Sequence, residues 1–415
     1  MPAAIALGAF SVLDPTPDWR PFLVLLIVVL LGGCEQQPEV RLDQQVYIWQ
    51  RQWRPAHQQA LMDSRADFST LRVLAAQEHP REGWIPARVD LDLLRRDGRP
   101  VIAVIRLDGQ LPSLDTQAIE GQLLPLLQAW QTRGVTLKGV EIDHDCASAR
   151  LPAYRDWLQH LRSRLPTELA LSITALPAWL DSPALPALLQ QVDSSVLQVH
   201  AVSRPQAGLF NPDQALRWTK AYAEVTSTPF YLALPAYGVA LLENEEGSAP
   251  NVESEVSLPL AGTRRELLAE PEQVAALLRE LDHNAPAQLH GLLWFRLPLA
   301  GDRRAWPLPT LQAVLHRQPL RSDIQLHLSQ QGALAELQLI NHGNLSAPLP
   351  RQLHITARDC EAGDGIGGYR LQRPLGDPVT LTLQAAPRQL AAGQQLAVGW
   401  LRCNQVDQGG LRVTP

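Results

Sequence analysis

The feature that most constrains the fold of this chain is a regular alternation of short apolar runs with amphipathic stretches, which starts at Val46. Such an alternation is typical of parallel strands covered by helices. The predicted strands span residues 46–49, 71–76, 101–107, 140–145, 169–175, 196–201, 230–235 and 291–297. These eight units cover roughly 270 residues, the size of a closed (β/α)8 barrel, so the predicted fold class is an α/β TIM barrel.

The segments between the apolar runs have the spacing of helices. One series begins Tyr154, Trp157, Leu158 and continues at one-face intervals. Asn211 followed by Pro212 marks the start of another helix, because Asn caps helices and Pro is tolerated in the first turn. An open doubly wound sheet is disfavoured, since no Gly-rich phosphate loop follows the first strand.

The pattern changes after Pro319. Strictly alternating polar and apolar residues at 324–328 and 379–383 predict an antiparallel β-sandwich accessory domain. Before it, the stretch 240–264 is rich in Glu, Ser, Gly and Pro, and we expect an irregular loop that could overhang the barrel mouth as a lid.

The N-terminal region contains an apolar run from Phe22 to Leu31 that ends in Leu31-Gly32-Gly33-Cys34 and then turns polar. It resembles a bacterial lipoprotein signal peptide, and the run is too short to span a bilayer comfortably. A buried core helix is the alternative. The resemblance implies lipidation at Cys34 and a membrane-anchored envelope protein, expected at the periplasmic side of the outer membrane. The residues before the run suggest an overextended start.

These patterns divide the chain into four predicted parts. They are a signal peptide at 1–34, a linker at 35–45, the barrel at 46–319 and the β-sandwich at 320–415.

Cysteine placement follows from export. An oxidising compartment permits a disulfide between Cys360 and Cys403, which would stabilise the final domain by about 4 kcal/mol. Cys146 lies beside Asp145, where a thiolate is disfavoured, so we interpret it as a small packing residue.

Charge limits the partners. The formal net charge is −6 and the pI is near 6.0, which lacks the basic excess that nucleic-acid binding needs. Small soluble molecules and neutral polymers stay open as partners. The sequence predicts no cofactor and no metal, and it identifies no protein partner.

Three carboxylates alternate along the fourth predicted strand. Glu141, Asp143 and Asp145 share one face, while Val140 and Ile142 face the covering helices. Barrel enzymes keep their catalytic groups at the C-terminal rim, which favours Asp143 and Asp145 as catalytic residues. Carboxylates this close cannot all ionise cheaply in a confined interior, so one should have a raised pKa and act as an acid.

The same alternation places further polar side chains inside the barrel. With Glu141, the predicted substrate-binding residues are Arg106, Asp108, Gln198, His200, Tyr237, Trp294 and Arg296. A polar interior is costly unless it binds something. The alternative is a satisfied interior network in which the two arginines neutralise the acids.

The segment Gly139-Val140-Glu141-Ile142-Asp143-His144-Asp145 resembles the strand-four motif of chitinase-like, family-18 glycoside hydrolases. In that family the motif ends in a Glu that is the general acid, preceded two residues earlier by an Asp that positions the substrate acetamido group. The resemblance implies that Asp145 is the acid and Asp143 its partner, with Asp145 in place of the family's longer Glu. Gly291-Leu292-Leu293-Trp294 resembles the family's last strand, whose Trp floors the sugar site.

More of the barrel resembles a family of bacterial lipoproteins of unknown function, through 142–146, 171–179 and 197–200. The leading hypothesis is a glycoside hydrolase acting on a polysaccharide or amino-sugar glycan. Its mechanism is either retaining through the substrate acetamido group or direct water attack with Asp108 or Glu78 as base.

Two other functions stay open. One is a non-catalytic glycan-binding or envelope-organising lipoprotein, which the Asp145 substitution favours. The other is a metal hydrolase that uses Asp143, Asp145 and His200, although no diagnostic ligand spacing supports it.

The lipidation prediction is tested with radiolabelled palmitate. Label should enter the wild type and not Cys34→Ala, because thioether lipidation requires that sulfur. Label retained by Cys34→Ala would contradict the prediction.

Overall fold

The structure is a computed structural model of the 415-residue chain. It describes residues 42–200, 208–243, 251–253, 263–302, 304–372, 378–384 and 389–414. The predicted signal peptide and Cys34 lie outside the described residues. Among the described helices, none has the length and apolar character needed to cross a membrane.

The central sheet closes on itself into a barrel of eight parallel strands. Its order is β1-β12-β8-β7-β6-β5-β4-β2, and β2 pairs again with β1. The strands are β1 (Asp43–Ile48), β2 (Thr70–His79), β4 (Val101–Leu107), β5 (Leu137–Asp143), β6 (Ala170–Ala175), β7 (Ser194–Gln198), β8 (Phe230–Pro235) and β12 (Leu289–Phe295). The short β3 (Gly83–Pro86) adds antiparallel to β2. The predicted TIM barrel is therefore confirmed.

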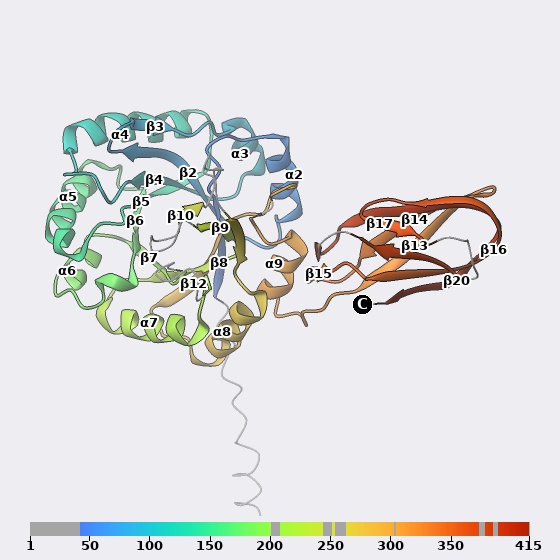
Figure 1. The fold of residues 1–415 in the computed structure, drawn as a ribbon. Helices are drawn as coiled ribbons and strands as arrows, with labels where there is room; N and C mark the ends of the chain where they lie inside the picture. The colour runs from blue at the N-terminus through green and yellow to red at the C-terminus, as the bar shows by residue number, and fades with distance from the viewer. Residues whose placement is uncertain are drawn as a thin grey trace, which may run out of the picture. The chain divides into compact units, whose positions relative to one another are not determined.

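A helix follows every barrel strand, and Figure 1 shows these helices around the strands. They are α2 (Pro55–Asp63), α3 (Leu91–Asp97), α4 (Thr116–Thr132), α5 (Leu151–Arg164), α6 (Leu185–Leu189), α7 (Pro212–Val225), α8 (Pro271–Asn284) and α9 (Leu308–Leu315). At α7, the Asn211 side chain accepts a hydrogen bond from the Gln214 N–H, as its capping role requires.

Strand boundaries differ from the prediction at positions that matter for function. β1 begins at Asp43, inside the segment we assigned to a linker. β5 ends at Asp143, so Asp145 lies in the following loop and not on the strand.

Two apolar layers surround the strand backbones. The large outer cluster packs between strands and helices and includes Val140 and Ile142 of β5. The small inner cluster fills part of the barrel interior with Tyr47, Trp49, Leu74, Val104, Val196, Ala233 and Leu293. Inward and outward residues alternate along each strand, as parallel barrels require.

An ion pair occupies the barrel interior beside the inner cluster. Arg72 on β2 pairs with Glu141 on β5, and both side chains are at most 1% exposed. Tyr47 donates a hydrogen bond to the other oxygen of Glu141, and Arg72 Nε donates to Gln45 at 2.8 Å. Burial raises the pKa of Glu141, while the positive charge of Arg72 opposes that rise.

The stretch that we expected to be irregular contains strands. β9 (Gly238–Glu243) pairs antiparallel with β10 (Asn251–Glu253) and with β11 (Thr263–Leu268). The expectation of an irregular loop over 240–264 is therefore wrong for these residues, and the remainder of that stretch lies outside the described residues.

The C-terminal region is all-β, as predicted. A six-stranded antiparallel sheet has the order β13-β14-β20-β16-β18-β17, and β15 pairs with β19 in a second, two-stranded sheet. The strands are β13 (Ile324–Gln331), β14 (Leu334–Asn341), β15 (Ala347–Pro348), β16 (Gln352–Gly365), β17 (Tyr369–Leu371), β18 (Val379–Leu383), β19 (Gln389–Leu390) and β20 (Gln395–Thr414). Leu349 beside β15 and Leu390 of β19 share one buried cluster with the larger sheet.

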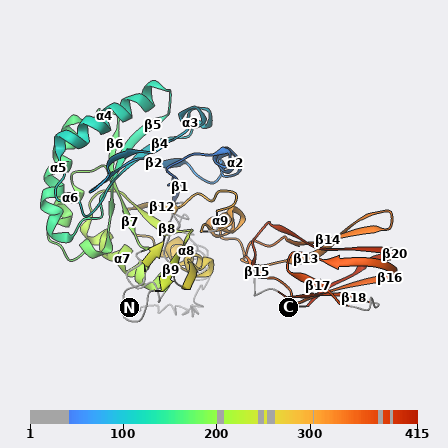
Figure 2. The same cartoon turned by 45° about the horizontal axis from the view of Figure 1, so that its top comes forward.

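The long strands β16 and β20 run side by side in Figure 2 and carry the disulfide. Cys360 and Cys403 face each other in the register and are bonded. Cys146 is a free, buried cysteine.

The interior ion pair gives a stability prediction. Glu141→Gln removes one charge and leaves Arg72 buried without a counter-charge, which should lower the free energy of unfolding by about 3–5 kcal/mol. Urea unfolding measures the loss. The matched control is the double variant Arg72→Met with Glu141→Met, which removes both charges and should lose much less. A double variant as unstable as Glu141→Gln would contradict the ion-pair explanation.

Candidate active site

Asp143 is held rigidly at the C-terminal end of β5. It is 3% exposed. Thr174 Oγ1 on β6 donates a hydrogen bond of 2.7 Å to Asp143 Oδ1, and Gln198 Nε2 on β7 donates to the same oxygen at 3.4 Å. Two neighbouring strands therefore fix this carboxylate, so its direction is set before any ligand arrives.

Asp145 lies two residues further on, in the loop after β5, and is exposed to solvent. Desolvation raises its pKa to about 7, with the negative charges of Asp143 and Asp108 adding to the rise and Arg106 opposing it. Because Asp145 is exposed, a ligand at the barrel mouth can reach its carboxyl group. An exposed carboxyl that keeps its proton near neutral pH can act as an acid.

Backbone contacts hold the loop that carries Asp145. His144 Nδ1 lies 2.9 Å from the Leu107 carbonyl oxygen, and the Trp179 indole donates to the Cys146 carbonyl at 2.9 Å. Gly109 packs directly on this loop, since a Cβ at position 109 would overlap the backbone carbonyl of Asp145. The position of Asp145 therefore depends on a glycine in the loop after β4.

The end of β4 supplies charges beside the two acids. Arg106 is paired with Asp143 in the strand register, and its guanidinium lies 6.0 Å from the centre of the Trp49 ring. Asp108 accepts a hydrogen bond from the Gln110 N–H. The structure thus brings Arg106, Asp108, Asp143 and Asp145 together at the ends of β4 and β5, although Asp145 reaches this place from the loop and not from the strand.

Aromatic rings form the wall next to these charges. Phe295, at the end of β12, has ring-centre distances of 5.7 Å to Tyr47, 5.2 Å to Trp49, 5.5 Å to His200 and 5.1 Å to Tyr237. Burial lowers the pKa of His200 to about 4, so its ring is neutral near pH 7. Tyr237 Oη lies 3.4 Å from His200 Nδ1. An aromatic wall beside carboxylates suits a ligand with both apolar faces and hydroxyl groups.

The last strand faces the other way from our prediction. Trp294 is fully buried on the outer side of the wall, where its indole donates to Gln44 Oε1 at 2.9 Å. Leu293 and Phe295 face inward in its place. Arg296 is 8% exposed and pairs with Asp302 at 2.7 Å. Trp294 therefore lies off the inner face, and its assignment to the inner-face site is wrong. Arg296 follows the end of β12 and lies near Tyr237 of the aromatic wall.

Two further carboxylates lie outside this group of acids. Both oxygens of Glu141 are taken by Tyr47 and Arg72 inside the barrel, so we leave Glu141 out of the ligand-contacting set. A register shift in β2 pairs Glu78 with Leu107, which belongs to the outer cluster. This β-bulge changes the face that Glu78 occupies, and Asp108 is the better placed candidate base.

The prediction missed the aromatic residues of the first strand and the true aromatic of the last one. Tyr47 and Trp49 lie two apart on a predicted strand, so alternation alone would have placed them on one face. Phe295 could not be separated from Trp294, because residues 292–295 are all apolar and both faces look alike.

Metal binding was predicted to be absent. In the part of the chain that the structure describes, no group of three or more His, Cys, Asp or Glu side chains is arranged to hold a metal ion. Burial raises the pKa of the Cys146 thiol to about 11, which keeps it protonated.

Comparisons with protein families identify two regions of unknown function. Residues 97–300 match DUF3142, a domain of unknown function, and residues 324–404 match DUF8456, another domain of unknown function. No curated protein matches the chain.

Comparison with solved structures finds a spore cortex-lytic enzyme and chitinases. The spore cortex-lytic enzyme SleL of Bacillus cereus is 14% identical, with a TM-score of 0.48 over 66% of this chain and 73% of that one. A chitinase from Chromobacterium violaceum is 13% identical, with a TM-score of 0.45 over 63% and 96%. A family GH18 chitinase from Chromobacterium violaceum is 11% identical, with a TM-score of 0.42 over 91% and 92%. The fold assignment itself rests on the strand pairings of this chain.

The Gly109 contact gives a local prediction. Gly109→Ala should displace the loop that carries Asp145, because its Cβ meets backbone that cannot rotate away. We expect a stability loss of about 1–3 kcal/mol, typical of overpacking. Hydrogen–deuterium exchange across 144–147 should also become faster.

Gly121→Ala is the matched control for Gly109→Ala. Gly121 lies within α4, and an added Cβ there would have nothing within 4 Å, so alanine should stabilise the protein by up to about 1 kcal/mol. Unchanged exchange at 144–147 in Gly109→Ala would show that the loop does not depend on this contact.

Proposed function

We propose that the barrel is a glycoside hydrolase acting on a polysaccharide or amino-sugar glycan, with Asp145 as the general acid. One observation carries the proposal. A rigid, buried carboxylate, Asp143, lies two residues from an exposed carboxyl, Asp145, whose pKa is raised to about 7. Two carboxyl groups with different environments, at the C-terminal mouth of a barrel, are the arrangement that glycosidic bond cleavage uses.

The two acids have separate roles in this proposal. Protonated Asp145 donates its proton to the glycosidic oxygen as the bond to the sugar carbon breaks. The carboxylate of Asp143, fixed by Thr174 and Gln198, stabilises the positive charge that develops on the sugar ring or on its acetamido group. The resemblance of residues 139–145 to the chitinase-like motif supports the same assignment.

The neighbouring rings and charges supply the binding surface in the proposal. Phe295, the half-buried ring of the aromatic wall, offers apolar contact for a sugar ring. Arg106 and Asp108 offer hydrogen bonds to the hydroxyl groups of the sugar. Lipidation at Cys34, if the palmitate experiment supports it, would locate this activity at the bacterial envelope.

The assignment of the acid is tested by substitution. Asp145→Asn should reduce hydrolysis of a chitin-type or peptidoglycan-type oligosaccharide by at least about 100-fold while binding persists, because the amide matches the carboxyl in shape but cannot donate the proton. Asp145→Glu should retain activity. Asp181→Asn, an exposed acid outside the site, is the matched control and should behave as wild type.

The direction in which activity changes with pH tests the same proposal. Activity should fall as pH rises through about 7, since Asp145 then loses its proton. Asp143→Asn removes a charge that raises the pKa of Asp145. As the pH rises, the activity that this variant retains should therefore be lost at a lower pH than in the wild type. Arg106→Gln removes a charge that lowers the pKa of Asp145, so the activity of this variant should persist to a higher pH than that of the wild type. Binding of glycans without hydrolysis, by wild type and by Asp145→Glu alike, would replace the enzyme with a glycan-binding module.

A further inference from the structure

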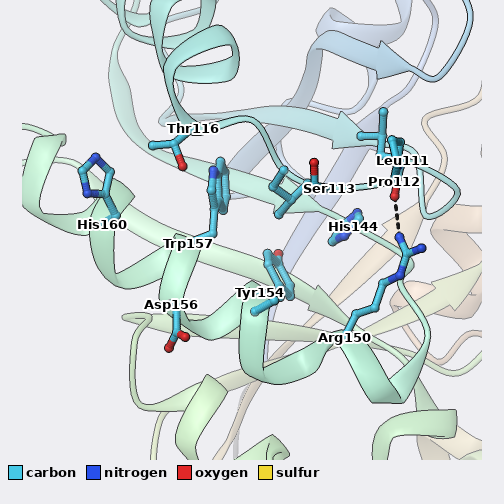
Figure 3. Close-up of a pocket in the computed structure, with 12 residues that line it drawn as sticks. Leu111, Pro112, Ser113, Thr116, His144, Arg150, Tyr154, Asp156, Trp157 and His160 are labelled. Carbon is cyan, nitrogen blue, oxygen red and sulfur yellow. Dashed lines mark hydrogen bonds between the residues drawn. The ribbon is translucent and has the colours of Figure 1, made fainter.

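A pocket lies on the outer side of the barrel wall, behind the strand that ends in Asp143 (Figure 3). Its volume is about 580 Å³, within the roughly 300–1,000 Å³ of small-molecule sites. It opens between the loop after β4 and helix α5. The lining residues that matter below are Leu111, Leu114, His144, Arg150, Tyr154 and Trp157.

Aromatic rings form one wall of this pocket. Tyr154 stacks on Trp157 with ring centres 6.3 Å apart, and the edge of His144 meets Tyr154 at 5.0 Å. Leu111 and Leu114 from the loop after β4 belong to the facing wall. These two walls suit a ligand with a flat, apolar ring.

His144 and Arg150 supply two polar groups to the lining. His144 Nδ1 lies 2.9 Å from the Leu107 carbonyl oxygen, so Nδ1 carries the hydrogen and Nε2 is a hydrogen-bond acceptor. Desolvation lowers the pKa of His144, which keeps the ring neutral, and the charge of nearby Arg150 lowers it further. In Figure 3 the guanidinium of Arg150 lies beside His144 at one end of the pocket, where it also donates to the Leu111 carbonyl.

We propose that this pocket is a binding site for a small, uncharged aromatic molecule that carries a hydroxyl group, of the phenol class. The hydroxyl would donate to His144 Nε2 and accept from Arg150, while the ring lies against Tyr154 and Trp157. A carboxylate ligand is disfavoured at His144, because Nε2 is an acceptor and a carboxylate has no hydrogen to donate to it.

The site is separate from the proposed active site. Asp143 is anchored on the inner side of the wall by Thr174, whereas His144, the next residue, contacts Tyr154 of α5 on the outer side. Binding here is therefore measured without hydrolysis, and the proposal stands or fails independently of the glycosidase.

Isothermal titration calorimetry of the whole protein with p-cresol tests the proposal. Wild type should show saturable binding. Ala153→Trp places a large ring in the pocket from α5 and should weaken the affinity at least tenfold. Gln159→Trp, an exposed position of α5 outside the lining, is the matched control and should bind as wild type. Toluene, which has the ring without the hydroxyl, should bind at least tenfold more weakly than p-cresol.

A second filling variant guards against a folding defect. Leu114→Trp fills the pocket from the opposite wall and should weaken binding in the same way, with the thermal unfolding temperature recorded for both variants. Absence of saturable p-cresol binding to wild type would overturn the proposal. Unchanged affinity in both Ala153→Trp and Leu114→Trp would also overturn the proposal. If toluene binds as tightly as p-cresol, the proposed hydrogen bonds of the ligand hydroxyl are wrong.

Discussion

The ion pair between Arg72 and Glu141 is the constraint on which the barrel interior depends. Two charges buried this completely are stable only as a pair with their remaining hydrogen bonds filled, and Tyr47 and Gln45 fill them. The pair connects β2 across the interior to β5. Because Arg72 compensates Glu141 in the interior, the same strand can carry another acid, Asp143, at its end without two unopposed charges along one face.

Much of the fold could be predicted from sequence because the strands and helices differ in period. The eight apolar runs contrasted clearly with their amphipathic neighbours, and all eight became barrel strands. The predictions that failed concern the faces of single residues. A bulge in β2 changed the face of Glu78, and the uniformly apolar 292–295 gave no signal that Trp294 faces outward. Alternation determines a face only where the two faces differ chemically.

The candidate site was predictable in part for the same reason. Arg106, Asp108 and Asp143 come from strands whose polar and apolar faces are distinct, and the structure brings them together with Asp145. The aromatic wall was harder, because it joins the first barrel strand to the last. Ring closure makes β1 and β12 neighbours, a relation that no local pattern in the sequence expresses.

The segment after β5 explains how one short stretch can serve two surfaces. Its residues still alternate as the strand ends, so Asp143 stays on the inner side while His144 and Cys146 pack on the outer side. Such a segment cannot be held by strand pairing, since β5 has already ended. It is held instead by Leu107, Gly109 and Trp179, each from a different element. The geometry of Asp145 is thus determined by contacts with residues that the neighbouring elements contribute, and not by the pairing of β5.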